Sequence, residues 1–278
     1  MKKFAVFGNP IAHSLSPLIH QMFAESCGEV IEYDKRCGSL EAFESEVNDF
    51  FFKEGALGGN FTVPFKERVF ALADEHDAAA KLAGAANTLH RQPSGNLKAY
   101  NTDGIGLVND LLAHQVPLQN SYVLILGAGG ATRGVIHPLL NAGVAHIYVL
   151  NRSKDKAIAL VEEANDLRVT ALDSVDAPLP NPPSVVINST SASLNNTVPA
   201  MPDAVFSSGA VAYDMVYGAS ATVFMQKAKA LGSQLQLDGL GMLVEQAAAA
   251  FSIWTGQNPP TDKVAKVLRD RISGQKEG

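Results

Sequence analysis

The stretch Val123–Asn151, VLILGAGGATRGVIHPLLNAGVAHIYVLN, decides the fold. Its apolar opening, 123–126, is too short for a helix and is typical of a buried parallel strand. Glycines at 127, 129 and 130 then lead into apolar residues at helical spacing, and a second apolar run covers 147–150. A strand, a glycine turn, a helix and a strand within about 35 residues predict one βαβ unit.

The glycine turn is the expected phosphate site of this unit. Free N–H groups and the helix dipole at a helix N-terminus favour an anion, so Gly127, Gly129 and Gly130 predict a seat for a dinucleotide pyrophosphate. The third small residue of the full G-x-G-x-x-G/A pattern is displaced or absent, and a tight turn without a ligand is the structural alternative. The strand before the glycines and the helix after them favour the binding site.

The residues after the second strand indicate which dinucleotide binds. An NAD site usually has Asp or Glu about 20 residues after the glycines, but the strand here ends in Asn151 and Arg152, with no acid at its tip. The Arg152 guanidinium can pair with a 2′-phosphate and stack on adenine, and Ser153 and Lys156 add a donor and a charge. We therefore predict NADP as the cofactor. A solvated basic loop before the helix expected at 155–164 is the structural alternative.

Composition places the chain among ordinary globular proteins. Its 278 residues suit about two domains, and 46% are hydrophobic and 18% charged. No apolar run reaches the ~18 residues of a membrane span, and 1–7 enters a strand pattern directly, so we expect a cytoplasmic protein that binds no membrane. A net charge of −6 without a basic stripe argues against nucleic acid as a partner. The cysteines and histidines have no metal-binding spacing, so no metal is predicted.

The first hundred residues alternate between strand and helix patterns. We predict strands over 3–8, 30–35 and 59–63 and helices over 17–27 and 40–53. The second of these helices is expected to turn four side chains inward, those of Phe43, Val47, Phe50 and Phe51. The alternation predicts a parallel sheet separate from the one that begins at Tyr122. Ser14 and Ser16 precede the first helix, where they can cap it or present hydroxyls to a ligand.

The stretch 60–66, NFTVPFK, holds a candidate acid–base group. On a strand, Asn60 and Thr62 point to one face, and Phe61 and Val63 to the other, so we expect the polar pair to face a ligand space while the apolar pair packs. Lys66 then falls in the first turn of the next helix, where the dipole disfavours a cation and suits the amine to proton exchange. Simple solvent exposure is the alternative for this lysine.

The rest of the chain returns to strands and helices. Residues 87–91 and 96–100 predict a β-hairpin, after which Asp103 is a candidate N-cap of the helix expected at 105–112. Later strands are expected at 168–172, 185–188, 210–216 and 234–237, and later helices at 222–231, 242–254 and 263–272. Asp214, Met215 and Tyr217 follow one of these strands at its carboxyl end, where open α/β sheets bind ligands.

Eight motifs in this order resemble those of the shikimate dehydrogenase family: GNPIAHSLSP (8–17), GGNFTVPFKE (58–67), AANTL (85–89), NTDG (101–104), GAGGATRG (127–134), NRS (151–153), YDMVYG (213–218) and DGLGMLVEQAA (238–248). The resemblance implies reversible NADP-dependent interconversion of 3-dehydroshikimate and shikimate, on the pathway to chorismate and the aromatic amino acids. It implies an α/β fold with a cleft between two domains. The substrate domain, 1–102 plus 239–278, would carry a mainly parallel mixed sheet, and 103–238 would be a Rossmann-like doubly wound NADP domain.

The resemblance also implies roles for individual residues. Lys66 and Asp103 are implied as the acid–base pair that serves hydride transfer at C3 of the substrate. Residues implied to hold the substrate are Ser14, Ser16, Asn60, Thr62, Asn87, Tyr217 and Gln246. Residues implied to bind NADP are Gly127, Ala128, Gly129, Gly130, Ala131, Asn151, Arg152, Ser153, Lys154, Lys156, Met215 and Gly239.

One departure from the family pattern concerns the cofactor clamp. The family often has N-R-T-x-x-R, whereas this chain has N-R-S-K-D-K, so Lys156 keeps the charge of a second arginine but loses its bidentate fork. Selectivity for NADP over NAD is therefore expected to be reduced. Three rival functions stay open: an enzyme that also oxidises quinate with NADP or NAD, an NADP-binding sensor without catalysis, and a dehydrogenase of another small acid. The expected partner is a small-molecule substrate, with the chain as a monomer or homodimer.

Overall fold

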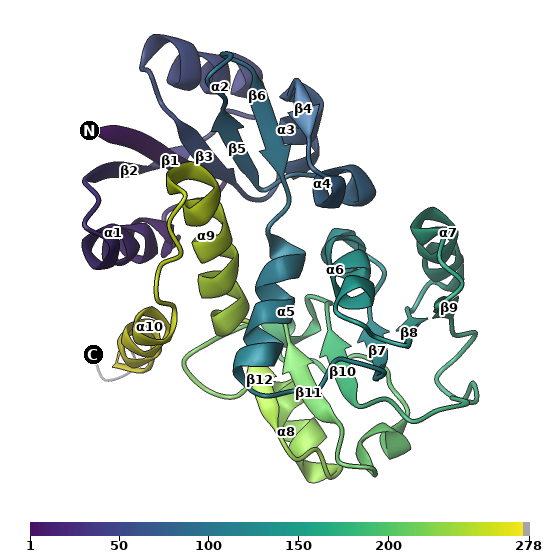
Figure 1. Ribbon diagram of the computed structural model, residues 1–278. Helices are drawn as coiled ribbons and strands as arrows, with labels where there is room; N and C mark the ends of the chain where they lie inside the picture. The colour runs from purple at the N-terminus through teal and green to yellow at the C-terminus, as the bar shows by residue number, and fades with distance from the viewer. Residues whose placement is uncertain (275–278) are drawn as a thin grey trace. The chain divides into compact units, whose positions relative to one another are not determined.

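The computed structural model describes residues 1–274, which divide into two compact units (Figure 1). Unit 1 comprises Met1–Gly106 and Val244–Val264. Unit 2 comprises Leu107–Leu243 and continues from Ala265 to the end of the described residues. The domains expected from the sequence, 1–102 with 239–278 and 103–238, have other boundaries and stay a prediction, and the final four residues of that range lie outside the described part.

Unit 1 is built on a mixed six-stranded sheet in the order β2-β1-β3-β5-β6-β4. Its strands are β1 (Lys2–Gly8), β2 (Ile31–Cys37), β3 (Gly58–Phe61), β4 (Glu75–His76), β5 (Thr88–Arg91) and β6 (Leu97–Tyr100). β1 pairs in parallel with β2 and β3, as the alternating pattern predicted. The predicted hairpin β5–β6 is antiparallel and joins β3, which makes the sheet mixed.

Most helices of unit 1 lie where the sequence pattern predicted them. The helices of this unit are α1 (Ser16–Cys27), α2 (Phe43–Asn48), the π-helix η1 (Asp49–Lys53), α3 (Lys66–Leu72), α4 (Ala78–Ala83) and most of α9 (Leu240–Thr255). The single helix predicted over 40–53 is wrong, because it begins at Phe43 and continues from Asp49 as a π-helix, in which Glu54 N donates to Asp49 O at 3.0 Å. The four apolar side chains predicted to face inward are nevertheless fully buried.

Aromatic side chains fill the core of unit 1. Phe7 stacks on Phe61 with ring centroids 5.2 Å apart, and all residues of this cluster are buried. Trp254 of α9 stacks on Phe4 at 4.7 Å and donates its indole N–H to Leu89 O at 3.0 Å. Trp254 thus belongs to the buried core of unit 1. Gly58 lies beneath the indole, where an added Cβ would collide with it.

Unit 2 is built on a fully parallel six-stranded sheet in the order β12-β11-β10-β7-β8-β9. Its strands are β7 (Tyr122–Leu126), β8 (His146–Leu150), β9 (Val169–Ala171), β10 (Val185–Asn188), β11 (Val211–Asp214) and β12 (Gln236–Asp238). In chain order this is the 3-2-1-4-5-6 arrangement of the doubly wound nucleotide-binding fold. The order reverses between β7 and β10, and such folds bind ligands at the carboxyl ends of the strands at this point.

The remaining elements of unit 2 connect these strands. They are α5 (Asp103–Ala113), α6 (Gly130–Asn141), α7 (Lys154–Ala164), α8 (Val223–Ala230), the 3₁₀ helices η2 (Ala192–Asn195) and η3 (Asp203–Phe206), and α10 (Asp262–Gly274). Of these, α5 and α10 begin in unit 1. The connection from β9 to β10 runs as a proline-rich loop. Arg269 of α10 donates to both Asp238 carboxylate oxygens, at 2.5 and 2.9 Å, which anchors this helix on unit 2.

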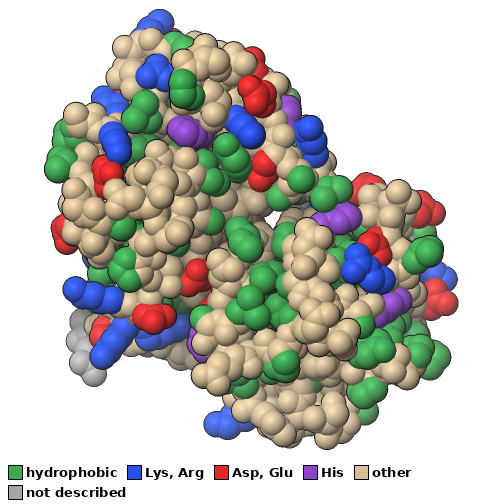
Figure 2. Space-filling view, in the orientation of Figure 1, with side chains coloured by type: hydrophobic (Ala, Val, Ile, Leu, Met, Phe, Trp, Pro, Cys, Tyr) green, Lys and Arg blue, Asp and Glu red, His purple; other side chains and the backbone are tan. Residues whose placement is uncertain are grey.

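Two properties of the chain bear on its surroundings. Within residues 1–274, none of the helices combines the length and the apolar character that crossing a bilayer requires. On the face shown in Figure 2, acidic and basic side chains are interspersed rather than gathered into one basic stripe, in keeping with the net charge of −6.

Candidate active site

The glycine turn after β7 has the geometry of a phosphate seat. Gly127 has a φ of +114°, and a Cβ there would lie 2.5 Å from Ser189 Oγ, so only glycine fits without strain. Thr132 Oγ1 donates to Gly127 O at 2.9 Å and fixes the turn. Gly129 is the N-cap of α6, and residues 129–131 are exposed. The first N–H groups of this helix are therefore open to an anion.

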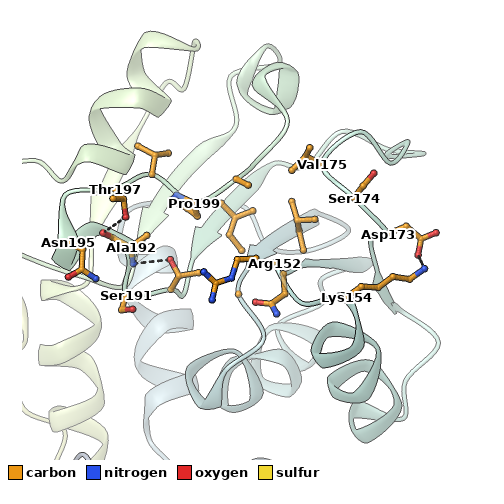
Figure 3. Close-up of a pocket in the computed structure, with 17 residues that line it drawn as sticks. Arg152, Lys154, Asp173, Ser174, Val175, Ser191, Ala192, Asn195, Thr197 and Pro199 are labelled. Atoms are coloured by element: carbon orange, nitrogen blue, oxygen red, sulfur yellow. Dashed lines mark hydrogen bonds and ion pairs between the residues drawn. The ribbon is translucent and has the colours of Figure 1, made fainter.

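A pocket of about 780 Å³ lies in unit 2 beside this turn (Figure 3). Gly127 forms one side of it, and Asn151, Arg152 and Lys154 follow β8 into it. The opposite walls come from 173–175 and from residues between Thr190 and Ala200. The carboxyl ends of β7, β8 and β10 thus meet at a cavity large enough for part of a nucleotide.

The basic residues of the predicted clamp have different surroundings. Figure 3 shows Arg152 extending into the pocket and Lys154 turned toward Asp173, with which it forms an ion pair of 2.8 Å. Ser153 is the N-cap residue of α7, and Lys156 lies exposed in its first turn. Lys156 does not line the described pocket. Arg152 is therefore the cation best placed to meet a phosphate there.

Two further residues predicted to bind the cofactor, Met215 and Gly239, follow strands β11 and β12 of the same sheet. Met215 comes directly after β11 and packs against the apolar core of unit 2. Gly239 follows β12, and a Cβ at this position would collide with the carbonyl oxygen of Met215. The glycine is thus required by close backbone packing, whether or not a ligand binds. Ala128 is partly buried at the start of the glycine turn.

A buried polar network that the sequence analysis missed supports the pocket wall. Asn188, at the end of β10, accepts from Thr190 N at 3.0 Å and donates to Asp214 Oδ1 at 3.0 Å. Ser193 and Thr222 each donate to Asp214 Oδ2 at 2.6 Å. Burial raises the pKa of Asp214, and these hydrogen bonds partly offset that rise. In the sequence, the only indication of this network is that two strands, β10 and β11, end in polar residues, Asn188 and Asp214.

The two residues predicted to be the acid–base pair contact each other in unit 1. Lys66, the first residue of α3, places Nζ 2.5 Å from Asp103 Oδ2, and the two side chains are 32% and 20% exposed. Asp103 Oδ1 accepts from Asn87 Nδ2 at 2.8 Å. Asn87 Nδ2 also lies 3.3 Å from Gln246 Oε1 on α9. The solvated lysine considered as an alternative is thus replaced by a half-buried ammonium held against a carboxylate.

The structure corrects two expectations around this pair. Asp103 is the first residue of α5 rather than the cap that precedes it, and its carboxylate binds Lys66 and Asn87 instead of the helix backbone. Val63 was expected to pack with Phe61, but it is 69% exposed. The reason is that β3 ends at Phe61, so the alternation of a strand no longer applies to Val63.

Asn60 and Thr62, expected to form one polar face, have different environments. Asn60 is 6% exposed, and its Oδ1 accepts from Tyr33 OH at 2.7 Å and lies 3.1 Å from His20 Nε2. Its side chain is thus committed to buried partners. Thr62 is only partly buried beyond the end of β3. Tyr33 and His20 carried no sequence signal, because each reads as an ordinary aromatic residue of a strand or helix.

The two serines at the start of α1 bond to each other. Ser14 Oγ donates to Ser16 Oγ at 3.2 Å and accepts from Ser16 N at 3.3 Å. The N-cap residue of α1 is Leu15, which makes no side-chain cap. The two hydroxyls are therefore bonded to each other, and neither belongs to the N-cap residue of α1. Tyr217, the remaining residue predicted to hold substrate, belongs to unit 2 and is 37% exposed.

His20 provides a pH-dependent test of this buried cluster. Complete burial lowers its pKa from 6.5 to about 3, with the hydrogen bond to Asn60 opposing the shift. Below pH 6.5 the unfolded chain protonates this histidine while the folded chain does not, so folding stability falls as the pH drops toward 3. As the pH falls from 7 to 5, we expect His20 to lower the free energy of unfolding by about 2 kcal/mol.

The measurement is urea unfolding of the wild type and His20→Gln at both pH values. The other titrating groups are shared by the two proteins and cancel in the comparison. Between pH 7 and 5 the free energy of unfolding should fall by about 2 kcal/mol more in the wild type than in the variant. Equal losses would show that the folded state protonates His20 as readily as the unfolded chain does.

Fold and site together fit a nucleotide-dependent oxidoreductase, with a Rossmann-like unit and a second unit in which Lys66 and Asp103 form an ion pair. Family models match most of the chain: the shikimate dehydrogenase substrate binding domain at residues 6–89, shikimate / quinate 5-dehydrogenase at 110–202, and the shikimate 5′-dehydrogenase C-terminal domain at 239–269. The shikimate dehydrogenase (NADP(+)) of Alteromonas mediterranea is 50% identical over 275 residues, which cover 98% of each chain. The chain belongs to the shikimate dehydrogenase family.

Solved structures agree with this assignment. An Ael1 enzyme from Pseudomonas putida superposes with a TM-score of 0.90 at 42% identity, covering 96% of this chain and 98% of that one. The shikimate 5-dehydrogenase of Thermus thermophilus, solved in complex with NADP(H) and shikimate, gives 0.83 at 36% identity, with coverage of 97% and 99%. The predicted family and the predicted α/β fold are confirmed.

Proposed function

We propose that the chain catalyses the reversible NADP-dependent interconversion of 3-dehydroshikimate and shikimate, a step on the route to chorismate and the aromatic amino acids. The observation that carries the proposal is the contact between Lys66 and Asp103, with Asn87 and Gln246 beside it. Membership of the shikimate dehydrogenase family supports the enzyme class and NADP as the cofactor.

The residues of unit 1 suit proton transfer at a reacting oxygen. When bound, the cofactor supplies hydride transfer at C3 of the substrate. As the ketone is reduced, its oxygen gains negative charge, and the Lys66 ammonium donates a proton to it. Asp103 holds the ammonium in place, while Asn87 fixes the carboxylate through its other oxygen. In the reverse direction the Lys66 amine takes the proton from the substrate hydroxyl.

The predicted substrate ligands of unit 1 fit a polar, hydroxylated acid. Ser14 and Ser16 offer neutral hydroxyl donors for a carboxylate, and Gln246 offers an amide for a hydroxyl. Neutral donors bind a carboxylate less strongly than a guanidinium does. We therefore propose moderate affinity for the substrate, with specificity set by several hydrogen bonds rather than by one ion pair. Thr62 and Tyr217 stay proposed substrate ligands on the family resemblance alone.

The residues of unit 2 suit NADP. The exposed start of α6 would hold the pyrophosphate, and Arg152 would pair with the 2′-phosphate in the pocket beside it. Asn151 stabilises the loop by donating to Ser153 O at 2.9 Å. Lys154 is engaged by Asp173, so its charge is already partly compensated. The proposed discrimination between NADP and NAD thus depends mainly on Arg152.

The direct test is the absorbance at 340 nm of purified protein supplied with shikimate and NADP. We expect NADPH to form with shikimate and at least tenfold more slowly with quinate. Parallel assays with NAD measure the cofactor preference. Quinate turnover at comparable efficiency would favour the broader rival enzyme, and no turnover of either acid would favour the NADP-binding sensor.

Arg152→Ala is expected to raise KM for NADP by about 10- to 100-fold and to leave KM for NAD within about twofold, because a hydrogen-bonded charge on the 2′-phosphate is lost. Steady-state kinetics with each cofactor provide the measurement. Lys156→Ala is the matched control, since this lysine lies outside the pocket lining and should have the smaller effect. Equal losses toward NADP and NAD would contradict 2′-phosphate recognition by Arg152.

A further inference from the structure

We propose that Thr88 is a positioning residue, the central link of a one-way hydrogen-bond relay that runs from Tyr33 through Asn60, Thr88 and Asn87 to Asp103. The proposal rests on the function proposed above, because it explains how the aspartate of the acid–base pair is oriented. All five residues belong to unit 1. Thr88 is completely buried on β5, so it is a positioning residue that acts through its two neighbours Asn60 and Asn87.

The orientation of Asn87 follows from partners that can only donate or only accept. Its Oδ1 lies 3.0 Å from Thr102 N, a backbone N–H that can only donate. Its Nδ2 lies 2.8 Å from Asp103 Oδ1, a carboxylate oxygen that accepts. The amide therefore has a single satisfactory orientation, in which Asn87 donates to the aspartate.

The orientation of Asn60 is fixed in the same way. Its Nδ2 faces the backbone carbonyl of Asn87 at 3.4 Å, which can only accept. Its Oδ1 therefore accepts from Tyr33 OH at 2.7 Å and from His20 Nε2, which must carry a hydrogen. This tautomer leaves His20 Nδ1 as a buried lone pair without a partner, consistent with a histidine that stays neutral.

Thr88 joins these two amides because a hydroxyl can accept and donate at once. Its Oγ1 accepts from Asn60 Nδ2 at 3.0 Å and donates to Asn87 Oδ1 at 2.9 Å. Every bond from Tyr33 to Asp103 then points the same way, and such chains polarise and stiffen one another. Burial raises the pKa of Tyr33 far above 10, so its hydroxyl stays a donor at the head of the relay, where Ser16 also bonds to it.

The relay predicts a specific consequence for catalysis. Without the Thr88 hydroxyl, Asn87 loses one of the donors to its Oδ1, and its amide plane is held less firmly against Asp103. The carboxylate that orients the Lys66 ammonium then samples unproductive positions. Asn60 and Asn87 are themselves predicted substrate ligands, but Ser14, Ser16 and Gln246 are not links of the relay, so the loss should appear mainly in kcat and much less in KM.

A pair of variants separates the hydroxyl from the packing. Thr88→Val keeps the shape and removes the hydroxyl, whereas Thr88→Ser keeps the hydroxyl and removes a methyl group. We expect kcat for shikimate oxidation to fall about 10-fold in Thr88→Val, with KM within about twofold, and to stay within about threefold of wild type in Thr88→Ser. A packing role predicts the opposite order. The proposal would be overturned if kcat fell as much in Thr88→Ser as in Thr88→Val, or if Thr88→Val kept the wild-type kcat.

A double-variant cycle keeps the proposal testable if Thr88→Val folds poorly. Tyr33→Phe removes the first donor and keeps the ring stacked on His20 at 4.4 Å. In a relay, Tyr33→Phe lowers kcat in the wild-type background but has little further effect in the Thr88→Ala background. If the two substitutions instead lowered kcat by independent factors that multiply, the relay would be overturned. An inactive wild type would overturn the proposed function and the relay with it, whereas an active wild type with multiplying losses overturns the relay alone.

Discussion

Replacing Lys66 with alanine is expected to lower kcat for shikimate oxidation by about 10² to 10⁴-fold, the usual contribution of a positioned general acid–base group. Nζ is the group that contacts Asp103, at 2.5 Å, and removing it leaves that carboxylate without its ammonium partner. KM for shikimate should change much less, because other residues are proposed to hold the substrate. Steady-state rates at 340 nm give both parameters.

Two controls make this result interpretable. Lys81→Ala removes an exposed lysine from α4 of the same unit and should leave kcat unchanged. The Lys66 side chain is one-third exposed, so the melting temperature of Lys66→Ala should stay close to that of the wild type. Retention of wild-type kcat in Lys66→Ala would remove this lysine from the mechanism, although membership of the family would stand.

Asp103→Asn is expected to lower kcat by about 10²-fold or more, because the amide keeps the shape of the carboxylate but not its charge. The neutral side chain no longer anchors the Lys66 ammonium, and its amide group can face Asn87 Nδ2 with a donor instead of an acceptor. The same assay, with shikimate varied at saturating NADP, measures the loss.

The double variant Lys66→Ala/Asp103→Asn shows whether the two side chains act as a unit. If they do, kcat of the double variant should be hardly lower than that of Lys66→Ala, because the effects of residues that act as a unit do not add. Losses that multiply would mean that Asp103 contributes independently of the lysine. A substrate-binding role for Asp103 would be recognised by a rise in KM with kcat preserved.

Much of the fold could be predicted from the sequence because local and tertiary preferences agree. The apolar run before Gly127 and the helical spacing after it predicted β7 and α6. The sequence also showed an arginine instead of an acid after β8, and that residue, Arg152, lines the pocket. The π-helix after Asn48 could not be predicted, because its apolar spacing resembles that of an ordinary helix. β4 has only two residues, too few to show any periodicity.

The site was predictable only where a residue type itself suggested chemistry. Lys66 and Asp103 stood out as titratable groups at the starts of expected helices, and these two side chains, 37 positions apart in the sequence, are in contact. Thr88 and Tyr33 are polar residues of strands, and periodicity places them in a sheet without showing which neighbours they bond. Their roles depend on cross-strand register, which one sequence does not specify.

The chain contains one tryptophan, and that indole is 7% exposed in the aromatic core of unit 1. Intrinsic tryptophan emission is therefore a built-in optical probe confined to one of the two units. Far-ultraviolet circular dichroism, by contrast, follows the helices of both. Comparing the two signals during denaturation would reveal whether the units melt together or in succession, without any added label.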